Sequence, residues 1–251
     1  MNKCYAYKAC SECGVFRNPH MPIELCNTLS LCEILKYSKI YNAVVFGTIE
    51  IDRNSRKQAF INHYQDQIEV IVCKRCALSR NCESPVPGEI FPFSDFLFIG
   101  LAPGRFGAEI SGKPFTRDRS GSFFRKMVSY LEGEGMIVSI TNIVKCNPTD
   151  DSGNNRDPRN NEIKKCTEHL LKEIVFSKPR IIVTLGRIVT SHITGIRNIT
   201  MEEVCGKVIQ TSGRIIVPIY HPSAVTNYHK ISMERYHFIF QSLVKIREGL
   251  D

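Results

Sequence analysis

Two closely spaced cysteines are the most specific chemical signal in the sequence. Cys73 and Cys76 form a C-x2-C pair, which can place two thiolates on one metal centre. Cys146 follows a hydrophobic run far downstream, and Cys166 lies in a segment with helical spacing. Four thiolates suit either a zinc ion or a four-iron cluster, so the spacing predicts a metal site without choosing its occupant.

A turn-rich loop follows directly after a hydrophobic run. Residues 98–121 read FIGLAPGRFGAEISGKPFTRDRSG, and the glycines allow the backbone to approach a ligand closely. Phe115 stands among charged residues of this loop and can serve as a stacking surface or as a core side chain. Asp118 can act on a water molecule or form an ion pair with Arg117 or Arg119. The loop is therefore a candidate binding wall.

Two further hydrophobic runs end in polar side chains. Asn142 ends the run SITN, and its amide offers both a donor and an acceptor, although such a residue is often only a turn or cap. His221 follows the run RIIVPIY and can donate a hydrogen bond to developing negative charge, or serve a structural role.

Four short hydrophobic runs must position these residues. They occupy residues 95–101, 136–144, 180–185 and 214–220, and alternate with segments of helical spacing at 121–132, 161–176, 187–194 and 231–248. This alternation predicts an α/β fold: a three-layer α/β/α sandwich with a central, mostly parallel four-stranded sheet. Because ligands bind at the carboxyl ends of parallel strands, the three polar loops are expected to meet there.

The composition is that of a globular protein with a basic surplus. The net charge is +8, and residues 95–251 carry 22 Lys and Arg against 16 Asp and Glu. Such a surplus favours a polyanionic partner. The chain has no apolar run long enough to span a membrane and no signal peptide at its start, so we expect a cytoplasmic protein. In that compartment its 11 cysteines favour metal binding over disulfides.

The first part of the chain differs from the rest. Residues 1–70 are predicted to be a Cys-rich accessory extension, and residues 71–251 the α/β domain. The extension contains a second C-x2-C pair, CSEC, and a second site that binds zinc is one interpretation of its cysteines. These are Cys4, Cys10, Cys13, Cys26 and Cys32.

Together, the three loops and four cysteines resemble the iron–sulfur uracil-DNA glycosylases of families 4 and 5. The resemblance rests on GLAPGRFG, GKPFTRDRSG, ITNIVKCNP, NRDP, EIKKC and YHPSA, and covers about residues 73–248. The first motif is closest to family 5, the B-type enzymes, whereas ITNIVKC is closer to family 4. Leu101 stands where family 4 typically has a catalytic glutamate.

The resemblance implies a role for each candidate residue. Cys73, Cys76, Cys146 and Cys166 would hold a [4Fe–4S] cluster. Gly100, Leu101, Phe115, Asn142 and Ser223 would bind the substrate, with Phe115 stacking on the flipped base and Asn142 pairing with its edge. His221, Asp118 and Asn155 would be catalytic. Lys113, Arg117, Arg119 and Lys145 would add charge for the phosphates.

The predicted function is that of a monomeric, monofunctional DNA glycosylase in base excision repair. It would hydrolyse the N-glycosidic bond of uracil in DNA. The resemblance also implies that family 4 has an acidic residue near the position of Gly107 that narrows the pocket; its absence here leads to the hypothesis that hypoxanthine or other deaminated bases are accepted too. The missing glutamate leaves an alternative open, a catalytically reduced iron–sulfur module that binds nucleic acid. A zinc-bound accessory protein is a third reading.

Overall fold

The structure is a computed structural model that describes residues 53–250, with side chains from residue 59 onward. The chain divides into two compact units, Met1–Asn62 and His63–Asp251. Of the first unit only the start of helix α4 (Arg53–Ile71) is described. The five cysteines of the predicted zinc site, Cys4, Cys10, Cys13, Cys26 and Cys32, lie outside the described residues. The accessory region of residues 1–70 therefore stays a prediction.

A sheet of short strands forms the centre of the second unit. The strands are β1 (Phe96–Gly100), β2 (Val138–Asn142), β3 (Ile181–Leu185), β4 (Ile209–Thr211) and β5 (Arg214–Ile219). Their order is β2-β1-β3-β5-β4, with β4 antiparallel to β5 and the other neighbours parallel. Every residue of β1, β2 and β3 is buried, as expected of strands covered on both faces.

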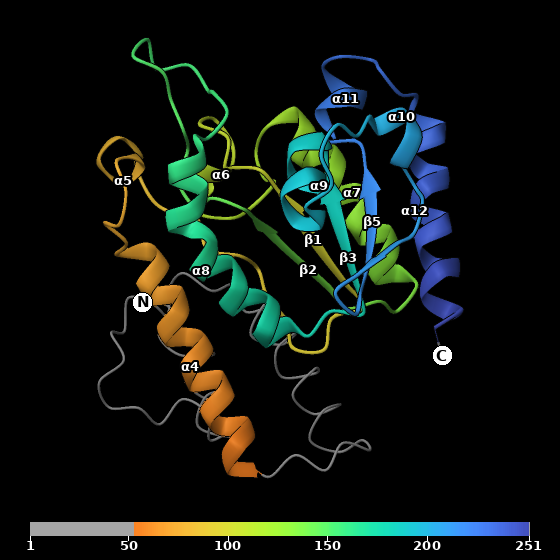
Figure 1. Ribbon diagram of the computed structural model, residues 1–251, viewed down its shortest axis with the longest axis horizontal. Helices are drawn as coiled ribbons and strands as arrows, with labels where there is room; N and C mark the ends of the chain where they lie inside the picture. Colours follow the sequence, from red (N-terminus) through yellow and green to blue (C-terminus); the bar gives the residue numbers. More distant parts are fainter. Residues whose placement is uncertain (1–52, 251) are drawn as a thin grey trace, which may run out of the picture. The chain divides into compact units, whose positions relative to one another are not determined.

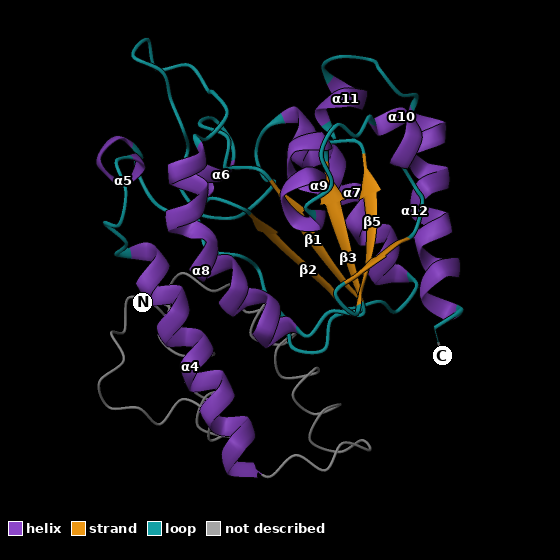
Figure 2. Cartoon of the chain, viewed as in Figure 1, coloured by secondary structure: helices purple, strands orange, loops and turns teal. Residues whose placement is uncertain are grey.

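Longer helices cover both faces of the sheet (Figures 1 and 2): α7 (Arg119–Gly133) and α12 (Met233–Glu248) on one, α8 (Asn160–Ser177) and α9 (Arg187–Thr194) on the other. The described residues also form the short helices α5 (Leu78–Asn81), α6 (Ala108–Ser111), α10 (Met201–Val204) and α11 (Ser223–Thr226). Alternate side chains of β1 point to opposite sides. Phe96 and Phe98 pack with residues of α7 and α12, whereas Leu97 and Ile99 pack with residues of α8 and α9. The sheet is therefore the middle of three layers.

The predicted α/β/α sandwich is confirmed, with one correction. The four predicted strands are present and parallel, but the sheet has a fifth strand, β4, at its edge. β4 has only three residues, none fully buried, so it lacks the apolar run by which the other strands were recognised. It pairs with β5 across the turn at Ser212 and Gly213, both at positive φ.

The four parallel strands end together. Gly100 on β1 is paired with Asn142 on β2, and Leu185 on β3 is paired with Ile219 on β5. Figure 1 shows these strands fanning out toward the loops that carry α6, α9 and α11. This edge therefore gathers the polar loops, as predicted. In the part of the chain that is described, no helix is long and apolar enough to cross a membrane.

Candidate active site

The loops at the carboxyl edge of the sheet enclose a cavity of about 630 Å³. Its walls come from the loop after β1, the start of α7, the segment after β2, the start of α9 and the segment after β5. Six of the predicted catalytic and substrate-binding residues line it: Leu101, Phe115, Asp118, Asn142, Asn155 and His221. A cavity of this volume with a few polar groups suits a small organic ligand.

Phe115 lies in the cavity wall, and its backbone is strained. Its φ is 53°, a conformation that a bulky residue keeps only when its surroundings impose it. Arg125 on α7 donates from Nε to the Phe115 carbonyl oxygen at 3.2 Å, bonds the Pro114 carbonyl oxygen, and pairs with Glu89 at 2.5 Å. A Cβ on Gly100 would lie 2.5 Å from Cζ of Phe115, so glycine there makes room for the ring.

Asn142 presents a free acceptor at the end of β2. The residue is 2% exposed, and its buried Oδ1 has no hydrogen-bond partner among the described residues. A Cβ on Gly100 would lie 2.3 Å from this oxygen, so the glycine also makes room for the amide. Because a buried unpaired acceptor is unfavourable, the amide is suited to receive a donor from a ligand.

His221 is held in one tautomer by the segment that follows it. The backbone N–H of Ser223 lies 3.2 Å from Nδ1 of His221 and donates to it, and Ser223 Oγ lies 2.8 Å from the same atom. Because Nδ1 accepts, the proton of the neutral ring is on Nε2. Burial lowers the pKa of His221 to about 4, an effect that the charge of Asp118 partly opposes. At neutral pH the side chain is therefore an uncharged donor.

Asp118 uses its two oxygens differently. Oδ1 accepts a hydrogen bond from the backbone N–H of Gly121 at 2.6 Å and caps helix α7. Oδ2 lies against two glycines of the loop after β1: a Cβ would come within 3.3 Å of it at Gly104 and 2.4 Å at Gly107. The carboxylate thus occupies the space where a side chain at position 107 would lie, and Asp118 lines the cavity.

Two asparagines after β2 contact each other at the cavity wall. Nδ2 of Asn147 donates to Oδ1 of Asn155 at 2.9 Å and to the carbonyl oxygen of Pro103 at 2.7 Å. The sequence did not single out Asn147, although it lines the cavity and directly follows Cys146. Its place just beyond the carboxyl end of a predicted strand, like that of Asn142, is the signal that could have found it.

The mouth of the cavity is basic and aromatic. Arg105, Arg119 and Arg187 are exposed residues that line it. Phe106 and Tyr228 also line it and are 74% and 67% exposed. Guanidinium groups bind phosphates and exposed aromatic rings stack on bases, so this rim suits a nucleic-acid strand.

Lys145 is a correction to the predicted set of phosphate-binding residues. Its side chain is buried and pairs with Glu173 on α8 at 2.6 Å. Nζ also donates to Thr141 Oγ1 at 2.6 Å and to the Asn142 carbonyl oxygen at 2.9 Å. An ammonium group used in this way cannot reach DNA. It links the end of β2 to the layer of helices beside it.

The four predicted metal-binding cysteines line a second, small cavity. Cys146 is buried, whereas Cys73, Cys76 and Cys166 are partly buried. A hydrogen bond with Cys82 and burial raise the pKa of Cys146, and burial raises that of Cys166. Buried thiols of this kind ionise when a cationic centre binds them. Among described side chains, no three His, Cys, Asp or Glu residues form a group spaced for a single metal ion.

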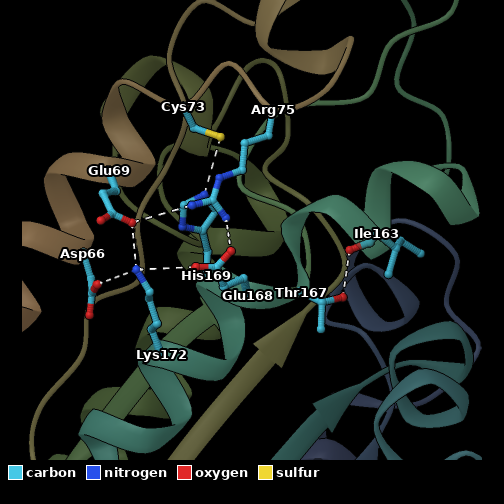
Figure 3. A network of polar contacts seen from close by, with 9 residues as sticks. All are labelled: Asp66, Glu69, Cys73, Arg75, Ile163, Thr167, Glu168, His169 and Lys172. Carbon is cyan, nitrogen blue, oxygen red and sulfur yellow. Dashed lines mark hydrogen bonds and ion pairs between the residues drawn. The ribbon is translucent and has the colours of Figure 1, made fainter.

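Polar contacts tie the segment that carries Cys73 to helix α8 (Figure 3). Nε2 of His169 on α8 lies 3.4 Å from Sγ of Cys73. Nearby ion pairs join Arg75 to Glu168, Lys172 to Glu69 and Lys172 to Asp66, at 2.5, 2.7 and 2.9 Å. These contacts fix the C-x2-C turn against the helix that carries Cys166.

Two predicted substrate-binding residues stand behind the cavity wall. Gly100 lies against Phe115 and Asn142, and Ser223 on α11 bonds His221. Neither lines the cavity, which places both in support of the residues that do.

Residues 87–243, more than half of the chain, match the family model of the Uracil DNA glycosylase superfamily. The chain belongs to this superfamily. The predicted family is thereby confirmed, and every residue that lines the large cavity falls within the matched span. Cys73 and Cys76 lie before that span.

Individual members of the superfamily are similar to the chain over most of their length. It is 37% identical to a Type-4 uracil-DNA glycosylase of Sulfurisphaera tokodaii over 168 residues, 62% of this chain and 72% of that protein. A Type-4 enzyme of Archaeoglobus fulgidus is 31% identical over 182 residues, 70% and 88% of the two chains. A Type-5 uracil-DNA glycosylase of Pyrobaculum aerophilum is 30% identical over 169 residues, 60% and 71% of the two.

Proposed function

We propose that the protein is a DNA glycosylase that flips uracil out of DNA and hydrolyses its N-glycosidic bond, the first step of base excision repair. One observation carries the proposal: six residues predicted from separate loops line one cavity at the carboxyl edge of the sheet, in a member of the Uracil DNA glycosylase superfamily. The relatives named as uracil-DNA glycosylases support uracil as the base.

Asn142 and Phe115 bind the base. The free Oδ1 of Asn142 accepts from N3–H of uracil, and the amide nitrogen donates to O4. A cytosine ring lacks the N3 proton and carries an amino group at the 4-position, so it is rejected by the same amide. The Phe115 ring, whose centroid lies 5.7 Å from that of His221, stacks on the face of the base.

His221 stabilises the leaving group. As the C1′–N1 bond breaks, its electron pair moves into the base, and negative charge develops on O2 of uracil. Nε2–H of the neutral His221 donates to this oxygen, while Ser223 holds Nδ1 from behind. A donor that is fixed and partly shielded from water before the reaction needs no reorganisation during it.

Asp118 acts on the attacking water. With glutamate replaced by Leu101, Asp118 is the carboxylate with an oxygen against the glycine loop of the cavity. The water oxygen bonds to C1′, its proton passes to Asp118, and the base leaves as the uracil anion. No lysine lines the cavity within the described part of the chain, which supports hydrolysis without a Schiff base and hence a monofunctional enzyme.

The four cysteines fit a [4Fe–4S] cluster. Cys73, Cys76, Cys146 and Cys166 offer four thiolates from three separate segments around one small cavity. Such a cluster supplies a covalent cross-link between these segments when bound, and the hydrolysis described above needs no electron transfer. Lys145 lines this small cavity and donates to the Asn142 carbonyl oxygen, so the cross-link would support the strand that carries Asn142.

Cleavage of a base panel tests the proposed function. The full-length protein is incubated with matched duplexes that contain uracil, hypoxanthine, thymine or cytosine, and abasic sites are then cut with alkali. We expect cleavage at uracil and none at thymine or cytosine. Cleavage at hypoxanthine would extend the base range. Absence of cleavage at every base would instead favour the alternative, a nucleic-acid-binding module that has lost catalysis. The observation behind this alternative is that the apolar Leu101 lines the cavity in place of a glutamate.

The remaining features complete the proposal. The exposed arginines and aromatic rings of the mouth bind the DNA strand, so affinity for DNA falls with salt. The protein acts as a monomer, and the cysteines of the accessory region, residues 1–70, bind zinc.

A further inference from the structure

Asn147 is the most deeply buried polar residue of the cavity wall, and the mechanism above does not use it. It is 1% exposed. Its side chain contributes to the wall together with Asp118 and Asn155. The catalytic scheme therefore leaves a buried amide in the reaction chamber without a task.

The orientation of this amide is fixed by its partners. The atom of Asn147 that faces the Pro103 carbonyl at 2.7 Å and Asn155 Oδ1 at 2.9 Å must be the nitrogen, because a carbonyl oxygen can only accept. Turning the amide over would place its oxygen against the Pro103 carbonyl oxygen. Nδ2 of Asn147 is thus committed to two acceptors.

This arrangement orients Asn155 as well. Asn155 is exposed on the segment that bridges back to Thr149, and an exposed amide side chain there would otherwise rotate freely. Since its Oδ1 receives the hydrogen bond from Asn147, its Nδ2 is left to donate toward the cavity.

The oxygen of Asn147 is the second free acceptor of the cavity wall. Oδ1 of Asn147 is buried and has no hydrogen-bond partner among the residues that the structure describes. Asn147 contacts Pro103, and Asp118 lies against the next residue, Gly104, so the two side chains reach adjacent positions of one loop. Asn147 and Asp118 line the same cavity. A water molecule, which can donate two hydrogen bonds and accept one, is the simplest ligand that could pair with both side chains.

We propose that Asn147 holds the attacking water: its Oδ1 accepts one hydrogen bond from the water, and its Nδ2 aims the Asn155 amide at the same water. The other proton of the water faces Asp118, which takes it as the oxygen bonds to C1′. This inference rests on the proposed function. It assigns to a pair of amides the orienting role that the leucine at position 101 cannot perform.

Single-turnover excision of uracil, with enzyme in excess over duplex, tests the inference. The variants are Asn147→Ala, Asn155→Ala and the double variant, with Asn154→Ala in the same segment as the matched control. We expect Asn147→Ala to lower the maximal rate at least about tenfold, the equivalent of one buried hydrogen bond, while duplex affinity changes less than about twofold. The double variant should lose little more than the worse single variant, because the two amides act together.

Asn147→Asp separates this role from that of a simple acceptor. The aspartate keeps an oxygen for the water, but it places a second oxygen against Pro103 and Asn155. We expect its rate to be no higher than that of Asn147→Ala. Recovery of the wild-type rate by Asn147→Asp would overturn the inference, and so would a loss confined to duplex affinity or to the choice of base.

The experiment also distinguishes the two proposals. If the wild-type protein releases no uracil, the proposed function fails. If it releases uracil and Asn147→Ala does so equally fast, only the inference fails. Should Asn147→Ala not fold, Asn155→Asp serves instead, because it keeps the acceptor for Asn147 and removes the donor to the water. A wild-type rate in that variant would overturn the inference.

Discussion

The large cavity that is proposed to bind the base (the base cavity) and the cysteine-lined cavity differ in how their buried polar groups are paired. In the base cavity, Asn142 and Asn147 each keep a buried oxygen without a partner among the described residues. Beside the cysteines, the buried ammonium group of Lys145 has three acceptors within 2.9 Å, and one of them is the carboxylate of Glu173. The base cavity thus keeps two oxygens for a ligand, whereas the buried charge beside the cysteines is fully paired. Near the cysteines, Nδ1 of His169 is a buried atom without a partner among the described residues.

We interpret this difference as one between residues that bind a ligand and residues that stabilise the fold. A buried free acceptor is unfavourable until a ligand pairs with it, and the strained backbone of Phe115 needs its surroundings to impose it. Both features support the proposal that this cavity binds a substrate. Fully paired buried charges stabilise one arrangement of the chain, and removal of one partner leaves the other uncompensated. We therefore expect substitutions in the two regions to affect different measurements.

Lys145→Met gives the largest expected effect on stability. The variant leaves Glu173 buried without its positive partner, so the free energy of unfolding should fall by about 3–5 kcal/mol. The measurement is denaturant-induced unfolding followed by circular dichroism. Absorbance near 400 nm reports any bound cluster in parallel.

Lys172→Met is the matched control for this substitution. Lys172 lies on α8, the helix that also carries Glu173, and pairs with Asp66 and Glu69, but its side chain is 30% exposed. We expect a loss of at most about 1 kcal/mol. Equal losses from the two substitutions would contradict the distinction between the paired interior and the surface.

The pH dependence of stability tests whether His221 is kept neutral in the base cavity. Burial lowers the pKa of His221 to about 4, below the ordinary 6.5, so the unfolded chain binds a proton more readily than the folded protein between these values. The wild type should therefore lose stability through this group as pH falls from 6.5 toward 4. His221→Ala removes that loss. Relative to wild type, it should gain roughly 1–3 kcal/mol between pH 7.5 and pH 4.5.

Unfolding of both proteins at the two pH values measures this shift, and the comparison cancels groups that they share. A constant difference between wild type and variant across that range would mean that His221 is not held neutral by its surroundings.

The sequence was sufficient for the framework of the fold. The runs that became β1, β2, β3 and β5 are continuous and rich in Ile, Val and Phe, because both faces of those strands are covered. The same argument placed Asn142 and His221 at one edge. Strand β4 escaped it because a three-residue, half-exposed edge strand carries no such run.

The partners of individual side chains could not be read in this way. Lys145 was predicted to bind phosphates, but its partner Glu173 lies on α8, and only the folded chain brings the two together. Asp118 shows the same limit. Its position suggested catalysis or an ion pair, whereas the structure also gives it the cap of α7. Asn147 was overlooked because its contacts with Pro103 and Asn155 depend on how the segment after β2 folds back on itself and meets the loop after β1.

The central claim is that the large cavity is where uracil is released, and His221→Ala tests it most directly. The measurement is single-turnover excision from a uracil duplex at pH 7.5 by wild type and variant, with matched circular dichroism and unfolding curves. Loss of one preorganised donor to the leaving group predicts a rate about 10²–10³ lower, with stability changed by less than about 1 kcal/mol. A variant that is stable and cleaves at the wild-type rate would contradict the account.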